Sequence, residues 1–185
     1  MWDYQQDRIS SPRPFAVDSS IILPLPGCCR EVVTFVSAVV VFNMSQVQDV
    51  LQLRVRYSET DKMGTFYNSR ALEWFECGRT ELMRRQLGMP YAALEQKGVF
   101  LPLVEAHLEF EGGARYDDLL DIATTVELSG RARLRFEVQI TQNATGKPVV
   151  QGYTIHAFAG PEGKPIRPPF WFVELLRKAA GPPKT

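Results

Sequence analysis

The sequence is poor in the residues that bind metals or build disulfide frameworks. Its 185 residues include three cysteines, Cys28, Cys29 and Cys77, and two histidines, His107 and His156. Adjacent cysteines rarely bridge each other, and Cys77 lies alone in a helical pattern, so this is not a disulfide-rich secreted domain. The two histidines lack the close ligand spacing of a zinc motif. These shortages predict no metal site and a reducing, cytoplasmic compartment.

An excess of charge of one sign and a long apolar run are also missing. Lys+Arg and Asp+Glu number 21 each, so the charge favours neither nucleic acid nor an anionic membrane as a partner. The apolar stretch EVVTFVSAVVVF is well short of the roughly 20 residues that span a bilayer, and no compact basic start precedes it, as a secretory signal requires. Neither a Gly-x-Ser-x-Gly elbow nor a phosphate-binding glycine loop occurs. What remains is a globular domain with a core of its own.

The first part of the chain differs from the rest. Residues 1–43 are punctuated by prolines and show neither helical nor strand periodicity. Three interpretations are open: a disordered or loosely docked extension, which is preferred, an upstream translation artefact with Met44 as the natural start, or a membrane-associating hairpin. The expected organisation is an extension over 1–43, a domain over 44–172, and a tail over 173–185 compatible with a short helix.

The order of periodic segments predicts an α+β fold. Alternation in LQLRVRY, residues 51–57, predicts a half-buried strand, and an apolar stripe at helical spacing predicts a long helix over 69–87. A short helix over 90–98 follows, and then strands over 99–110, 119–128, 131–140 and 149–159. Gly78 in the long helix costs about 1 kcal/mol relative to alanine, so close packing is expected there. A sheet must curl around that helix to bury it, and its open edge favours pairing between subunits.

The segment YSETDKMGTFYNS, Tyr57–Ser69, carries the chemistry-bearing residues. It places Asp61 in a polar run, followed by Gly64, two aromatic residues and the start of the long helix. A carboxylate there either caps a turn or acts on a group held at the positive end of the helix. Asn68, at the helix start, is compatible with a plain N-cap, with a role in turnover, or with both.

The stretch RYSETDKMGTFYNSRALEWFECGRTELMRRQLGMPYAALEQKG strongly resembles hotdog-fold acyl-CoA thioesterases of the 4-hydroxybenzoyl-CoA thioesterase-like family. The similarity continues through LPLVEAHLEFEGGARYDDLLDI and VVQGYTIHAF. It implies a hotdog fold, in which a curled antiparallel sheet wraps one long central helix. It also implies hydrolysis of acyl-CoA without a metal or organic cofactor, since coenzyme A is part of the substrate. The implied assembly is a homodimer or homotetramer with its site at a subunit interface.

The resemblance assigns roles to individual residues. The acid of the TD..G segment is the family's catalytic carboxylate and matches Asp61, and the tyrosine four positions earlier matches Tyr57. Many relatives carry a histidine where this sequence has Asn68. An amide holds a water or a carbonyl by hydrogen bonding but does not accept a proton near neutral pH. If the histidine orients, asparagine suffices, and if it titrates, this chain works differently or not at all.

Thioester hydrolysis explains why these residue types are needed. Free N–H groups at a helix start stabilise the charge that grows on the carbonyl oxygen, and Gly64 lets the backbone approach the ligand. Tyr67 is expected to contact the substrate. Asp61 either attacks the carbonyl, giving a mixed anhydride, or activates a water, and the sequence leaves both routes open. Glu59 is expected to be solvated rather than catalytic.

Further features leave alternatives open. The basic strand face of Arg131, Arg133 and Arg135 either meets the phosphates of coenzyme A or is solvated or engaged in subunit pairing. One alternative function is a non-hydrolysing module that binds acyl-CoA or acyl carrier protein. Another is a hydratase or dehydratase of acyl thioesters, which fits less well because no histidine lies in the motif.

Overall fold

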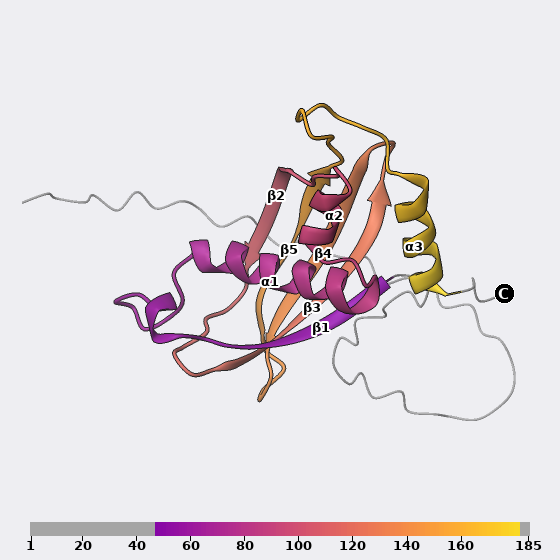
Figure 1. The fold of residues 1–185 in the computed structure, drawn as a ribbon. Helices are drawn as coiled ribbons and strands as arrows, with labels where there is room; N and C mark the ends of the chain where they lie inside the picture. The colour runs from indigo at the N-terminus through magenta and orange to yellow at the C-terminus, as the bar shows by residue number, and fades with distance from the viewer. Residues whose placement is uncertain (1–46, 182–185) are drawn as a thin grey trace, which may run out of the picture. The chain divides into compact units, whose positions relative to one another are not determined.

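The computed structural model of the protein describes residues 47–181. Strand β1 (Val47–Arg54) is followed by the short 3₁₀ helix η1 (Tyr57–Glu59), the long helix α1 (Ser69–Gln86) and the short helix α2 (Tyr91–Gln96). Four strands come next: β2 (Leu103–Phe110), β3 (Leu119–Ser129), β4 (Arg133–Gln142) and β5 (Pro148–Ala157), before helix α3 (Phe170–Ala180) (Figure 1). This is the predicted order of elements. The expectations for residues 1–43 lie outside the described residues.

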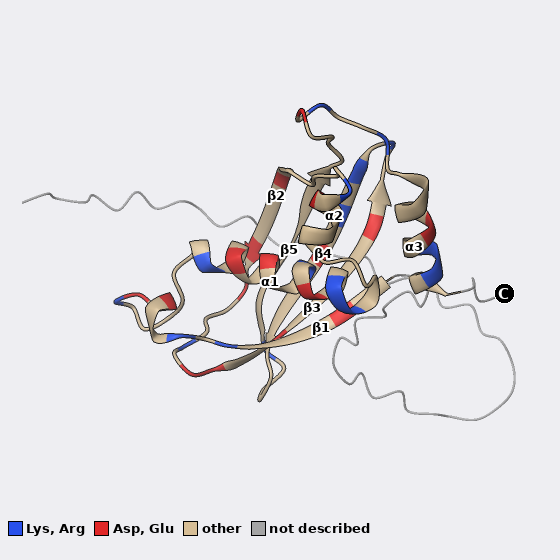
Figure 2. Cartoon of the chain, in the orientation of Figure 1, with Lys and Arg blue, Asp and Glu red and all other residues tan. Residues whose placement is uncertain are grey.

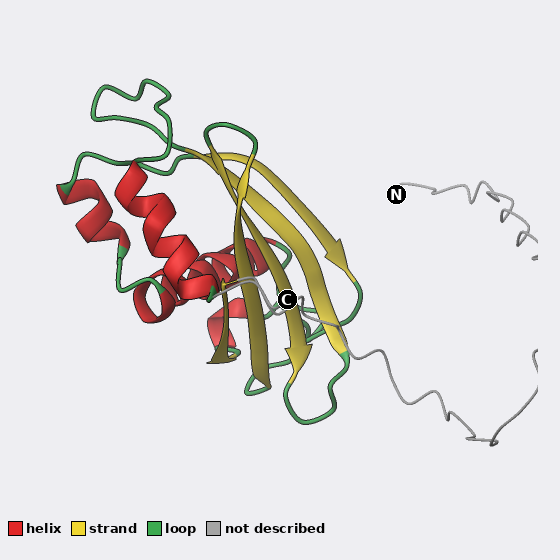
Figure 3. Cartoon of the chain, turned by 90° about the vertical axis from the view of Figure 1, so that its right-hand side faces the viewer, coloured by secondary structure: helices red, strands yellow, loops and turns green. Residues whose placement is uncertain are grey.

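The five strands form one antiparallel sheet in the order β1-β3-β4-β5-β2. The sheet curves, and the helices lie on one of its faces (Figure 3). The strand expected over 131–140 is present as β4, and its alternate side chains Leu134, Phe136, Val138 and Ile140 are all buried. Strands β1 and β2 are the two edges of the sheet in the described chain. The predicted hotdog architecture, a curled antiparallel sheet around a long helix, is confirmed.

Helix α1 lies across the concave face of the sheet (Figure 1). Its buried residues are Ala71, Trp74, Phe75, Gly78, Leu82 and Met83. A Cβ atom added at Gly78 would lie 2.5 Å from Oγ1 of Thr124 and 2.8 Å from Cγ2 of Ile122. The close packing expected around this glycine is therefore present, and β3 is the element that approaches it.

The core has two apolar clusters, one at each half of α1. The cluster at the first half holds Trp74 and Phe75 with Phe66 and Ile122, and it supports the segment that leads into α1. The cluster at the second half includes Val126 and two α3 residues, Phe172 and Leu176. Helix α3 thus lies across the boundary expected at residue 172. Between Ile122 and Val126 on β3 lies the buried polar residue Thr124, and β5 adds the buried Thr154 and His156.

Strand ends differ from the predicted ones by a few residues. Strand β1 starts at Val47 and stops at Arg54, so Tyr57 belongs to η1 and not to a strand. Strand β2 starts at Leu103 rather than Val99, because the preceding Pro102 has no N–H to donate to a neighbouring strand.

Candidate active site

The segment between η1 and α1 folds back on itself as a narrow hairpin. Its rungs pair Glu59 with Tyr67, Thr60 with Phe66, and Asp61 with Thr65, and the backbone N–H groups of Tyr67 and Asp61 each donate over 2.8 Å. The N–H of Gly64 closes the turn by donating to the carbonyl oxygen of Asp61 at 3.0 Å. Gly64 has φ of 76°, which glycine adopts without steric cost. The hairpin therefore places Asp61 at the last rung before its tip.

The Asp61 carboxylate is half-buried and only partly engaged. Its Oδ1 accepts a hydrogen bond of 2.7 Å from the backbone N–H of Met63. Its Oδ2 makes no hydrogen bond or ion pair within residues 47–181. One oxygen thus fixes the turn, and the other is available to a substrate carbon or a water molecule. The turn role and the chemical role are compatible in one residue.

Two backbone donors are free where α1 begins. The N–H of Arg70 donates to the carbonyl oxygen of Tyr67 at 2.8 Å, and that of Ala71 donates to Asn68 at 3.3 Å. In the described chain, the N–H groups of Asn68 and Ser69 have no hydrogen-bond acceptor. Both therefore lie at the positive end of the helix with their donors unused. Such a pair is suited to hold a carbonyl oxygen on which negative charge develops.

The side chain of Asn68 is exposed and makes no capping hydrogen bond. Its backbone already has helical angles, φ of −48° and ψ of −39°, whereas a capping residue usually lies in the extended region. The plain N-cap that the sequence left open is therefore not observed, and the amide of Asn68 is free to bind a ligand.

Aromatic rings line one side of this helix start. The buried ring of Phe66 lies 4.9 Å from the ring of Trp74 and 6.2 Å from that of Phe110, measured between centroids. Phe110, at the end of β2, is half-exposed, and so is Tyr67 next to Asn68. Phe66, Trp74 and Phe110 thus form an aromatic cluster beside the start of α1.

Tyr57, which the resemblance matches to a tyrosine of the related thioesterases, lies on the surface of the described chain. Its side chain is 78% exposed and packs edge-to-face against Tyr116, with ring centroids 5.6 Å apart. Its hydroxyl makes no hydrogen bond within the described residues, to Asp61 or to any other group. Within one chain, Tyr57 is close in sequence to Asp61 but does not hold its carboxylate.

Arg131 and Arg133 lie at the other end of the sheet from Asp61. Arg131 lies in the β3–β4 turn and Arg133 is the first residue of β4, a strand on which Figure 2 shows basic residues. Both line a hollow with Val104, Ala157 and Pro165. Strand β3 begins beside the end of β1, near the hairpin, and runs for 11 residues to that turn. At about 3.3 Å per residue, the arginines are roughly 30 Å away from the hairpin. A single chain does not bring them together with Asp61.

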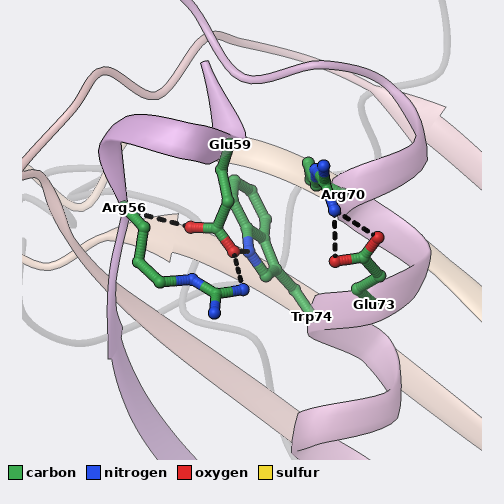
Figure 4. A network of polar contacts seen from close by, with 5 residues as sticks. All are labelled: Arg56, Glu59, Arg70, Glu73 and Trp74. Atoms are coloured by element: carbon green, nitrogen blue, oxygen red, sulfur yellow. Dashed lines mark hydrogen bonds and ion pairs between the residues drawn. The ribbon is translucent and has the colours of Figure 1, made fainter.

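Glu59 is the residue of this region whose environment the sequence did not reveal. It was expected to be solvated, and that expectation is wrong, because only 1% of it is exposed. Its carboxylate accepts hydrogen bonds from the Arg56 backbone N–H at 2.7 Å, the Arg56 guanidinium at 2.8 Å and Nε1 of Trp74 at 3.1 Å (Figure 4). Burial acts to raise the pKa of Glu59, but the hydrogen bonds from Arg56 and Trp74 outweigh it and lower that pKa. The only sequence signal was Trp74, whose indole N–H needs an acceptor when buried.

Residues 47–181 contain no group of three or more histidine, cysteine, aspartate or glutamate side chains arranged to hold a metal ion. Nor does any helix in this range have the length and apolarity needed to cross a membrane.

Comparisons with known proteins connect this geometry to a family. A family model described as the thioesterase-like superfamily matches residues 55–179. The putative acyl-CoA thioesterase YneP of Bacillus subtilis is 37% identical over 76 residues, which are 41% of this chain and 54% of that protein. The chain thus spans about half the length of that relative. The acyl-CoA thioesterase YbgC of Haemophilus influenzae is 31% identical over 91 residues, 49% of this chain and 67% of that one.

Solved structures agree with the fold. The DHNA-CoA thioesterase of Staphylococcus aureus superposes with a TM-score of 0.64 at 27% identity, covering 71% of this chain and 87% of that one. The 4-hydroxybenzoyl CoA thioesterase of Pseudomonas sp. strain CBS-3 has a TM-score of 0.60 at 23% identity, covering 69% of this chain and 98% of that one. At that identity, the second likeness supports the shared architecture alone.

Proposed function

Because the chain belongs to the thioesterase-like superfamily, we propose that it hydrolyses an acyl-CoA thioester to the free acid and coenzyme A. One observation carries the proposal: a single segment presents a carboxylate oxygen of Asp61 without a partner and the unused N–H groups of Asn68 and Ser69. These are the two requirements of acyl transfer, a nucleophile or base and a site for the oxyanion. The names of the Bacillus and Haemophilus relatives support coenzyme A as the thiol portion.

In the proposed reaction, the thioester carbonyl oxygen lies against the N–H groups of Asn68 and Ser69. A preorganised donor of this kind contributes about 10²–10³ in rate. Two routes are open to Asp61. Its Oδ2 attacks the carbonyl carbon, the C–S bond breaks, coenzyme A leaves as a thiolate that takes up a proton, and water hydrolyses the mixed anhydride. Alternatively, Oδ2 takes a proton from a water molecule that attacks the carbonyl carbon directly.

Asn68 limits which residue can accept the proton of the attacking water. Its amide donates or accepts hydrogen bonds but does not act as a base near neutral pH. In this proposal it orients the attacking water or the carbonyl, and Asp61 alone supplies the base or nucleophile. No metal or organic cofactor takes part, and coenzyme A enters as part of the substrate.

We propose that a second copy of the chain completes the site along β2. This edge strand exposes Leu103, Val104 and Phe110, and every position of it except Leu108 is exposed. Unpaired strand edges with apolar side chains favour pairing with another chain. Two copies of β2 paired antiparallel about a twofold axis bring the Leu103 end of one beside the Phe110 end of the other.

The same arrangement would give Arg131 and Arg133 a role. Their hollow includes Val104, near the start of β2, whereas the hairpin with Asp61 lies near Phe110, at the end of β2. In the proposed dimer, the arginines of one copy approach the hairpin of the other and can meet the phosphates of coenzyme A. Changing both to alanine then raises KM for acyl-CoA but not for the matching acyl-pantetheine. An unchanged ratio of the two KM values contradicts this role.

A non-hydrolysing module that binds acyl-CoA or acyl carrier protein is the competing function, because Asn68 replaces the family's histidine. Release of free thiol from a panel of short, long and aromatic acyl-CoAs by the full-length protein separates the two. The proposal predicts steady-state thiol release with at least one class of acyl group, and the preferred class identifies the substrate. Ligand binding without thiol release overturns hydrolysis, and in that case Asn68→His is the variant to test for restored turnover. The reducing compartment that cysteine usage indicates stays a prediction.

A further inference from the structure

Glu59 is a charged residue in a place where charge is costly. Among the buried polar residues of the described chain it is the one carboxylate, and it is 1% exposed. Removing an ion from water costs several kcal/mol, and well-packed apolar residues often replace a buried ion pair without loss of stability. Stability alone is therefore a poor reason for a carboxylate here. A better reason is that the hydrogen bonds of this carboxylate connect two neighbouring elements.

The carboxylate ties η1 to α1. Its Oε2 accepts from the Arg56 backbone, and its Oε1 accepts from both the Arg56 guanidinium and the indole N–H of Trp74. Trp74 is the sixth residue of α1, and its ring also packs on Phe66 of the hairpin, 4.9 Å away. Trp74 thus contacts the base of the hairpin through Glu59 (Figure 4) and its return strand through Phe66.

The backbone of Glu59 forms the base of the hairpin. Its carbonyl oxygen accepts the N–H of Tyr67 at 2.8 Å. Two residues after Glu59 comes Asp61, and directly after Tyr67 comes Asn68 with its unused N–H. Asp61 and Asn68 therefore lie on opposite sides of the Glu59–Tyr67 rung along the hairpin. The side chain of Glu59 links that rung to α1.

We infer that Glu59 is a positioning residue, which sets the separation between the Asp61 carboxylate and the free N–H groups of Asn68 and Ser69. It does not touch the substrate, because it is buried and both of its oxygens already accept hydrogen bonds. The inference rests on the proposed thioester hydrolysis. A shift of about 1 Å between reacting groups is enough to cost about 10²-fold in rate, so a small movement of this rung has a large effect.

Three variants of the full-length protein test the inference. Trp74→Phe keeps a buried ring and removes the donor to Glu59. Glu59→Gln keeps one acceptor oxygen but turns an N–H₂ group toward the donors. The double variant Glu59→Met with Trp74→Phe removes both partners and leaves no buried charge without a donor. Tyr91→Phe is the matched control, because it removes one polar atom from an aromatic ring that bonds Arg79, far along α1 from the hairpin.

The expected result is a fall in kcat of about tenfold or more in all three variants, with KM within threefold of wild type, while Tyr91→Phe stays within twofold in both constants. The double variant is the decisive one. If Glu59 had only a structural role, both stability and kcat would recover in the double variant relative to the single variants. A kcat per folded molecule within twofold of wild type in Trp74→Phe and in the double variant overturns the inference. If Glu59→Gln does not fold, these two variants decide.

The same assay separates this inference from the function on which it rests. Wild-type protein that releases no thiol, or an Asp61 variant that retains full activity, refutes the proposed chemistry and the positioning role with it. A working wild type that depends on Asp61 but is indifferent to the Glu59–Trp74 pair refutes the positioning role alone.

Discussion

Two carboxylates stand two residues apart in this chain and have opposite environments. Asp61 is half-buried near the tip of a hairpin and keeps one oxygen without a partner. Glu59 is buried at the base of that hairpin, and each of its oxygens accepts at least one hydrogen bond. A carboxylate that attacks a thioester or activates water must be ionised and accessible, whereas one that holds elements in place must be saturated with donors. In the proposed reaction, Asp61 is therefore the acid that reacts, and Glu59 is the acid that positions it.

The buried histidine predicts how stability depends on pH. His156 is buried, its Nδ1 lies 2.9 Å from the carbonyl oxygen of Leu101, and its Nε2 lies 3.2 Å from Oγ1 of Thr154. Burial lowers the pKa of His156 from 6.5 to about 4, against the opposing effect of the bond to Leu101. As pH falls below 6.5, His156 therefore becomes protonated in the unfolded chain but stays neutral in the folded chain. The contribution of His156 to stability is complete above pH 6.5 and falls by about 3 kcal/mol as pH falls to 4.

The free energy of unfolding in urea at pH 7, 5.5 and 4 measures this loss. His156→Gln is expected to flatten the part of the profile between pH 6.5 and 4. His107→Gln is the control, because His107 is exposed and its partners, Glu109 and Tyr153, lie with it on the surface. An identical profile for His156→Gln and wild type would contradict the assignment.

At the scale of elements, α1 joins the core to the site. Its buried face fits β3 so closely that Gly78 leaves no room for a side chain, and its first turn presents the free N–H groups. Because the helix is held along its length by two apolar clusters, its N-terminus is fixed relative to the sheet. In the proposed reaction, a substrate carbonyl would therefore meet donors that are already in position.

Gly78→Ala tests that fit. Alanine favours a helix over glycine by about 1 kcal/mol, but the new methyl group collides with Thr124 and Ile122. Overpacking typically costs about 1–3 kcal/mol, so a net loss of stability is expected, visible in urea unfolding. Glu76→Ala on the exposed side of the same helix serves as the control and is expected to stay within about 0.5 kcal/mol of wild type. A more stable Gly78→Ala would show that α1 is held loosely.

Local sequence patterns predicted which helices and strands exist better than they predicted the residues at which these begin and end. The long helix was expected over 69–87 and spans Ser69–Gln86, because Gly88 and Pro90 stop it by local chemistry. The start of β2 was missed by four residues, because Pro102 interrupts the strand after the isolated bridge between Phe100 and Ala159. The hotdog architecture followed from element order and from the resemblance.

The site was predictable only where it is local. Asp61, Gly64 and Asn68 lie within one short segment, and the structure keeps them in one hairpin and helix start. The burial of Glu59 depends on Trp74, 15 residues later, so an acid in a polar run gave no sign of it. The distance of Arg131 and Arg133 from Asp61 follows from strand direction in the folded sheet, which alternation alone does not specify.

At the scale of the whole molecule, the open edge of the sheet and the candidate site lie close together. Strand β2 ends at Phe110, whose ring stacks on Phe66 of the hairpin, and most of this strand is exposed. A second copy on this edge would bury apolar surface and enclose the helix start from water. A low-dielectric site strengthens the hydrogen bonds that hold the oxyanion.

Ala106→Asp tests the dimer. Ala106 is exposed in the middle of β2, so a charge there would stand in the proposed interface. The expected result is a shift from dimer to monomer in sedimentation velocity, accompanied by loss of thioesterase activity. Val50→Asp on the opposite edge strand, where Val50 is also exposed, is expected to change neither. A monomeric Ala106→Asp protein with full activity would place the complete site within one chain.

The most direct test of the whole account compares two half-buried aspartates that each accept one backbone hydrogen bond within a turn. Asp61 and Asp118 are both half-buried, and each accepts one backbone N–H at 2.7 Å, from Met63 and from Arg115. Asparagine keeps that turn contact in either position but is neither a base nor a strong nucleophile. Thiol release by Asp61→Asn is predicted to fall by about 10²–10⁴-fold, while Asp118→Asn stays within twofold of wild type. Equal activity of the two variants would contradict the account and leave Asp61 as a turn residue.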